Sequence, residues 1–229
     1  ILITGAARSG TSMVAGAINI CGAFGGDMSG PTSNNRKGMF ENYKVRNTII
    51  KPYLRDLGLD PKGQYPLPDP EKIPIPNDWK ERVQKIFKDQ GYEDGPWMYK
   101  GAKMCLFWPV WNHAFPNAKW IIVRRRDGDV ANSCLKTGFM NAFEKEQFQK
   151  EVGVDNERDG WIWWIEQHKK RFREMMDAGL NCKIVWPERM VEGDYHQMYE
   201  TLEWLGLDVE DYFSEVIQFV DPKLWKARH

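Results

Sequence analysis

The chain has 229 residues, of which 42% are hydrophobic and 28% charged, and its 32 basic and 32 acidic side chains leave no net charge at pH 7. This length suits a single α/β domain over residues 1–229, and the balanced charge argues against nucleic acid as a partner. The sequence has no apolar run near the roughly 18 residues that span a bilayer, so we expect no membrane span.

The first expected elements are a buried strand at residues 1–4 and a helix of small and apolar residues at 11–21. The turn between them nearly matches the phosphate loop G-x-x-x-x-G-K-S/T, but Thr11 stands in place of the lysine and Arg8 lies inside the loop. Backbone N–H groups at a helix N-terminus bind anions, and the hydrogen-bonding residues of this loop favour that use, although an ordinary tight strand–helix turn is the alternative. The candidate phosphate-binding residues are Ala7, Arg8, Ser9, Gly10, Thr11 and Ser12.

A long glycine-rich and polar loop follows at residues 21–38, and the pattern at 39–54 predicts a helix. The stretch at 61–76 is rich in proline and cannot form a regular element, so we expect a linker or a surface excursion near a site, at about residues 58–97. Within it, the pattern at 78–90 predicts an amphipathic helix. The prolines of this stretch are Pro61, Pro66, Pro68, Pro70, Pro74 and Pro76.

Strands and helices alternate in the rest of the chain. We expect a strand, a loop and a helix at 97–115, a strand at 119–126 and a helix at 129–140. The remaining predictions are a helix at 158–179, a strand at 181–190 and a helix at 195–208. This alternation predicts an α/β fold, a three-layer sandwich with a central parallel sheet covered on both faces.

A second candidate anion site follows the strand at 119–126, which ends in three arginines. The next helix is expected to start at about Asp129 as its N-cap. Arg125 and Ser133 could then point toward one place, although a solvated basic turn paired with Asp127 and Asp129 is the alternative. Both candidate sites would lie at the carboxyl ends of parallel strands, where such sheets bind ligands.

These residues resemble the motifs of the PAPS-dependent sulfotransferases. In that family the 5′-phosphosulfate loop is a basic residue followed by Ser-Gly-Thr-Thr/Ser, as in residues 8–12 here. The 3′-phosphate motif is an arginine, three residues and Asp-Val-x-x-Ser, which matches Arg125 to Ser133. Residues 99–126 and 186–207 are similar to segments of the bacterial and carbohydrate-type members, and the likeness as a whole covers roughly residues 1–45 and 97–207.

The resemblance implies a P-loop NTPase-like sulfotransferase fold and an enzyme that moves a sulfonate group from PAPS (3′-phosphoadenosine 5′-phosphosulfate) to a hydroxyl or amine. Adenosine 3′,5′-bisphosphate would be released, and no metal is required. It also implies that Arg8 contacts the leaving phosphate, while Arg125 and Ser133 hold the 3′-phosphate. The acceptor, a small molecule, glycan or lipid, is left open by the sequence, as is the oligomeric state.

The general base departs from the Lys-x-His pattern of the cytosolic members, because Lys100 is followed by Gly101 and Ala102. Other branches use a glutamate after the first helix and its loop, which implies Glu41 as the catalytic base here. A carboxylate that merely stabilises a helix start is the alternative. The fallback base is His113.

Further departures and candidates concern the binding of the two substrates. Met13 stands where the family places an aromatic that stacks on adenine, and the Arg-Lys-Gly segment of the cytosolic members is missing. Lys100 and Lys103 could stabilise the sulfonate or hold acceptor groups. Of the eleven tryptophans, most are expected in the core, and some could line an acceptor cleft.

Four scattered cysteines are expected to be free thiols of a cytoplasmic protein, although Ile1 already lies in a strand-like run and a signal or anchor upstream stays open. Two other functions remain as alternatives. One is a P-loop kinase with a displaced lysine, and the other is a catalytically inactive nucleotide-binding interaction module.

Overall fold

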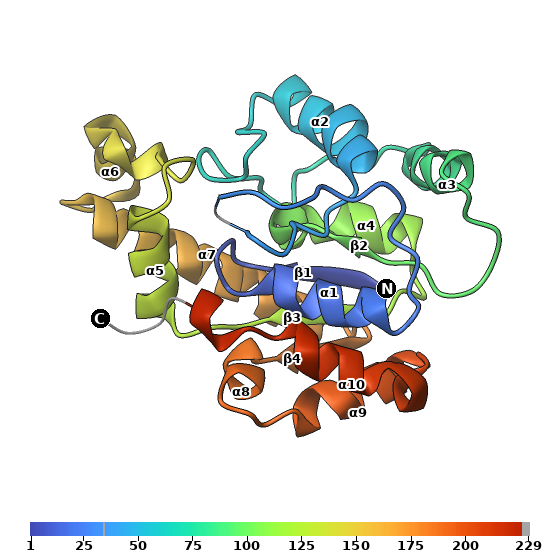
Figure 1. The fold of residues 1–229 in the computed structure, drawn as a ribbon. Coiled ribbons are helices and arrows are strands. Elements are labelled where there is room, and N and C mark those ends of the chain that lie inside the picture. The colour runs from blue at the N-terminus through green and yellow to red at the C-terminus, as the bar shows by residue number, and fades with distance from the viewer. Residues whose placement is uncertain (34, 226–229) are drawn as a thin grey trace.

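The computed structural model describes residues 1–33 and 35–225. Its centre is a parallel sheet with the strand order β2-β1-β3-β4 (Figure 1). In the register of this sheet, Ile3 pairs with Ile121, and Ile121 pairs with Lys183. The strands are β1 (Leu2–Gly5), β2 (Tyr99–Lys100), β3 (Trp120–Val123) and β4 (Cys182–Val185).

Helices cover both faces of the sheet, because successive strand residues point to opposite sides. Leu2 and Ile122 belong to one hydrophobic cluster, whereas Ile3 and Ile121 belong to another. On the first face lie η1 (Val45–Ile50), α2 (Lys51–Asp56), α3 (Trp79–Asp89), η2 (Ala102–Phe107) and α4 (Trp108–Ala114). On the second lie α1 (Thr11–Ile20), α8 (Pro187–Val191), α9 (His196–Leu205) and α10 (Val209–Phe219). This arrangement confirms the predicted α/β sandwich with a central parallel sheet.

A third hydrophobic cluster lies past the carboxyl end of β1, where Ala6 packs with side chains of a further group of helices. The helices of this cluster are α5 (Asp127–Leu135), η3 (Ala142–Glu144), α6 (Glu146–Val152) and α7 (Glu157–Asp177). Figure 1 shows α5, α6 and α7 on that side of the sheet. Helix α7 runs past both the first and the third cluster, because Phe172 belongs to one and Trp161 to the other. A separate short helix, η4 (Pro222–Leu224), lies near the end of the described chain.

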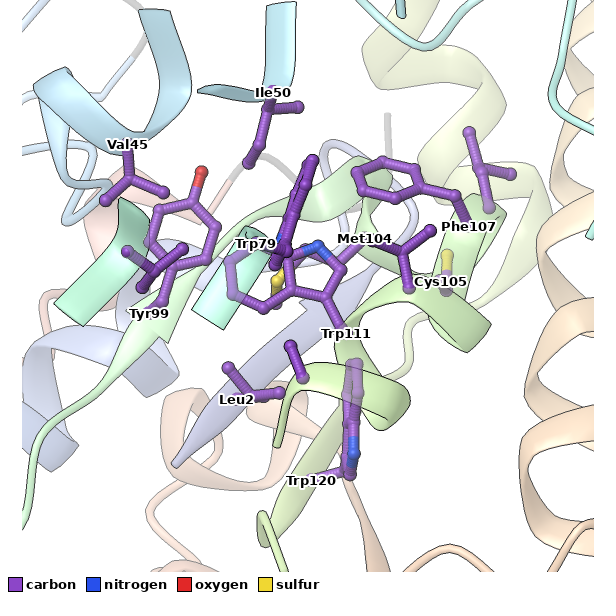
Figure 2. Close-up of a cluster of buried hydrophobic side chains, with 14 of the residues drawn as sticks. Leu2, Val45, Ile50, Trp79, Tyr99, Met104, Cys105, Phe107, Trp111 and Trp120 are labelled. Carbon is purple, nitrogen blue, oxygen red and sulfur yellow. The ribbon is translucent and has the colours of Figure 1, made fainter. Parts of the chain in front are cut away.

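Aromatic side chains fill the first cluster (Figure 2). Trp79, Trp111 and Trp120 are fully buried there, and the ring of Tyr99 stacks on Trp111 with 5.0 Å between ring centroids. Five of the eleven tryptophans are buried in the core, and four more are partly buried against it. The hydroxyl of Tyr99 donates a hydrogen bond to Glu41 at 3.3 Å, so the core reaches the candidate site directly.

Two predicted helix starts were wrong. The helix predicted from residue 39 starts at Tyr43, because the backbone ahead of it pairs with residues 27–29 and the Asn42 side chain accepts a hydrogen bond from Val45 N. Helix α5 begins at Asp127, with Arg126 and not Asp129 as its N-cap. Both carboxylates therefore lie in its first turn, where they interact favourably with the helix dipole.

Cys21, Cys105, Cys134 and Cys182 are free thiols, as predicted, and only Cys182 is partly exposed. Within residues 1–33 and 35–225, none of the helices combines the length and the apolar character needed to cross a membrane.

Candidate active site

The loop between β1 and α1 has a backbone shape that its glycines make possible. A Cβ atom on Gly5 would lie 2.5 Å from the carbonyl oxygen of Val123, so a side chain there would collide with β3. Gly10 has a φ of 93° and is the N-cap of α1, where the left-handed conformation favours glycine. Arg8 also has a positive φ of 71°, a conformation that costs a non-glycine residue about 1–3 kcal/mol and is concentrated at functional sites.

The two candidate anion sites are in direct contact, although more than one hundred residues separate them in the sequence. Arg8 Nε donates a hydrogen bond of 3.0 Å to Ser133 Oγ. Arg125 Nη1 donates one of 3.1 Å to the carbonyl oxygen of Arg8. Burial lowers the pKa of both guanidinium groups, but arginine stays protonated in proteins, so two cations meet at this end of the sheet.

A cavity of about 920 Å³ opens over this contact, toward the upper end of the roughly 300–1,000 Å³ typical of ligand pockets. The predicted site residues that line it are Ala7, Arg8, Gly10, Thr11, Ser12, Glu41, Arg125 and Ser133. Ser9 is the exception. It is 1% exposed beneath the loop, and its hydroxyl has no hydrogen-bond partner among the described residues, so only its backbone could face an anion.

Glu41 lies in the same cavity with basic groups on three sides. Its carboxylate is 3.6 Å from Arg46 and 3.9 Å from both Lys100 and Lys103. Burial alone would raise the pKa of Glu41, but these three cations and the Tyr99 hydroxyl lower it below its ordinary value of 4.5. The carboxylate is therefore ionised at neutral pH and can accept a proton. Its side chain therefore pairs with cations from three different elements.

Some of the other residues singled out in the sequence line the cavity, and others lie outside it. Met13, Lys100 and Lys103 line it. His113 is exposed on α4 and lies outside it, which removes the fallback base. Of the tryptophans considered as acceptor contacts, Trp164 lines the cavity, whereas Trp111 and Trp120 are core residues.

The proline-rich excursion lies near the site, as one of its two predicted alternatives requires. Gln64 is 2% exposed, lines the cavity and donates a hydrogen bond of 2.7 Å to the carbonyl oxygen of Phe139. Its side-chain oxygen accepts hydrogen bonds from the backbone of Asn141 and Ala142. These bonds hold the excursion against the segment that follows α5.

Sequence reasoning missed two contributors to the cavity. The segment of residues 221–225 covers the anion end, where the Trp225 ring lies 4.3 Å from the Arg125 guanidinium and also packs on Gly10. Arg46 completes the surroundings of Glu41 from η1. The basic residues Lys44 and Arg46 follow Glu41 closely in the sequence and could have indicated Arg46. No local sequence pattern connects Trp225 with the loop between β1 and α1.

The described part of the chain contains no group of three or more His, Cys, Asp or Glu side chains placed to hold a metal ion.

Comparisons with known proteins identify the fold. No family model matches the chain, and no curated protein matches it. Among solved structures, the chain is similar to the sulfotransferase STF9 from Mycobacterium avium, with a TM-score of 0.56 and 14% sequence identity. The match covers 95% of this chain and 66% of that one, so the chain spans just under two thirds of the length of STF9. The protein thus has a sulfotransferase-like fold.

Proposed function

We propose that this protein is a sulfotransferase that moves a sulfonate group from PAPS to a hydroxyl or an amine of an acceptor. One observation carries the proposal. Two separate anion-binding segments meet through the contacts from Arg8 to Ser133 and from Arg125 to the Arg8 carbonyl. A donor with phosphates at two positions needs such a pair, and the similarity of the fold to STF9 agrees with it.

In this proposal, the chain positions the donor from two sides. The loop N–H groups and Arg8 would hold the 5′-phosphosulfate, and Arg125 with Ser133 would hold the 3′-phosphate. Each charge-assisted hydrogen bond contributes about 1.5–3 kcal/mol, so three or four such contacts support micromolar binding.

During transfer, the bond between the sulfonate sulfur and the phosphate oxygen breaks, and a bond from sulfur to the acceptor oxygen forms. The acceptor's proton passes to Glu41, and adenosine 3′,5′-bisphosphate leaves with the negative charge of the broken bond. Arg8 would stabilise that charge on the leaving phosphate, and Lys100 or Lys103 would stabilise the equatorial oxygens of the sulfonate.

A positioned general base contributes about 10²–10⁴-fold to a rate. Because the pKa of Glu41 is lowered below its ordinary value, its carboxylate is a weak base at neutral pH. Orientation and electrostatic stabilisation by the basic groups must therefore supply a large part of the acceleration.

Isothermal titration with adenosine 3′,5′-bisphosphate and, separately, with ATP plus Mg²⁺ separates this proposal from the kinase. We expect micromolar binding of the bisphosphate and at least tenfold weaker binding of ATP. Tighter binding of ATP would favour a P-loop kinase. Bisphosphate binding without sulfonate transfer to any acceptor in a broad screen with ³⁵S-labelled PAPS would favour the inactive interaction module.

A further inference from the structure

Four basic side chains gather at the Glu41 end of the cavity, and we call them the cationic cluster: Arg46, Lys51, Lys100 and Lys103. Three of them lie within 4.0 Å of the Glu41 carboxylate, and all four line the cavity. Lys51 is half-buried beside them. Burial and then the neighbouring Arg46 and Lys103 lower the pKa of its ammonium group.

Burying these basic side chains together costs the protein solvation free energy that its own groups do not fully offset. The side chain of Lys100 is 5% exposed and that of Lys103 is 12% exposed, yet each reaches Glu41 only at 3.9 Å, beyond hydrogen-bond distance. Arg46 Nε is buried with no hydrogen-bond partner among the described residues. Buried charges in proteins are ordinarily paired and hydrogen-bonded, so these donors indicate that an anion belongs beside them.

The sulfonate of the donor does not balance all of the excess positive charge in the cationic cluster. Four cations face one carboxylate, and a transferring sulfonate adds one more negative charge. Two positive charges remain. Arg8, Arg125 and the loop N–H groups, which the proposed function assigns to the donor's phosphates, are not part of this cluster.

We infer that the acceptor is itself an anion, a molecule with a sulfate, phosphate or carboxylate group near the hydroxyl that receives the sulfonate. This inference rests on the proposed function, since it takes Glu41 as the group that meets the acceptor hydroxyl. The anionic group contacts the cationic cluster and turns the hydroxyl toward Glu41. By neutralising nearby cations, the bound anion also relieves the effect that lowers the pKa of Glu41, and the base becomes stronger only when the acceptor is in place.

The test uses protein saturated with adenosine 3′,5′-bisphosphate, so that the donor site is filled. Isothermal titration compares glucose 6-phosphate with glucose, which has the same hydroxyls without the charge. A second arm compares sedimentation with phosphatidylglycerol vesicles and with phosphatidylcholine vesicles, because the anionic group can belong to a soluble sugar or to a lipid headgroup. We expect at least tenfold preference for the anionic member of one pair, and a smaller preference at high salt.

Lys51→Met should reduce that preference at least fivefold, whereas Lys44→Met should leave it unchanged, because Lys44 is exposed just ahead of η1 and outside the cavity. Retained bisphosphate binding shows that each variant is folded. Equal or absent binding of both members in both arms, with the bisphosphate still bound, would overturn the anionic acceptor and leave the sulfotransferase proposal standing. Failure of the bisphosphate to bind wild type would instead remove the proposed function.

Discussion

Glu41 illustrates how single residues acquire their properties here from distant parts of the chain. Its carboxylate precedes η1, while its cationic neighbours come from η1, β2 and η2, and Tyr99 reaches it from the aromatic core. The ionised form gains more from these groups than it loses by burial. The carboxylate therefore stabilises the fold fully above about pH 4.5, and this contribution is lost as the pH falls through the lowered pKa.

The pKa of Glu41 should depend most on Lys103, its largest electrostatic partner. In Lys103→Met the burial effect is less opposed, so we expect the pKa of Glu41 to rise above its value in wild type. A ¹³C NMR titration of the glutamate carboxyl carbons, with Glu41→Gln to assign the signal, measures this. Lys44→Met should give the wild-type value, and an unchanged or lowered pKa in Lys103→Met would show that the ion pair is not formed.

At the scale of elements, local sequence patterns predicted what local contacts determine. The loop after β1, the ends of α1 and α3, and the helix stop at Gly206 follow from glycine positions and apolar periodicity. Helices α6, α8 and α10 were missed. Pro187 begins a new helix directly after β4, within the stretch predicted to be strand up to residue 190, and α10 follows the helix predicted at 195–208, which was the last element expected.

In the site, too, some features follow from local sequence and others depend on tertiary packing. The spacing from Arg125 to Ser133 is local and could be read from the sequence, since about two turns of α5 connect the two residues. The contact of this motif with Arg8, the cationic cluster around Glu41 and the position of Trp225 depend on how distant elements pack. Sequence spacing alone carries no information on such contacts.

The segment of residues 221–225 should support the nucleotide end of the cavity. The Arg125 guanidinium lies over the Trp225 ring, 4.3 Å from its centroid, and such a cation–π contact contributes about 0.5–2 kcal/mol. We expect Trp225→Ala to bind adenosine 3′,5′-bisphosphate three- to tenfold more weakly by isothermal titration.

Trp204→Ala is the matched control, because Trp204 also contacts basic side chains, Lys119 and Lys183, but lies outside the cavity. It should bind like wild type. Tighter binding by Trp225→Ala would mean instead that the indole occupies space the nucleotide needs.

For the whole molecule, the parallel sheet explains why the site lies where it does. The β1 and β3 strands are neighbours in the sheet, and their carboxyl ends lead into the loop with Arg8 and the turn with Arg125. Packing on the two faces then fixes the helices that follow each strand. The cavity is thus positioned by the sheet order, while its charge comes from side chains on many elements.

The affinity ratio between adenosine 3′,5′-bisphosphate and AMP tests the central claim most directly, because these ligands differ by the 3′-phosphate alone. Isothermal titration should give a ratio of tenfold or more for wild type and near one for Arg125→Ala, since each charge-assisted contact contributes about 1.5–3 kcal/mol. Arg126→Ala should keep the wild-type ratio, because the Arg126 side chain is 58% exposed and outside the cavity. A ratio near one for wild type, or one that Arg125→Ala leaves unchanged, would contradict the assignment of this site to a 3′-phosphorylated donor.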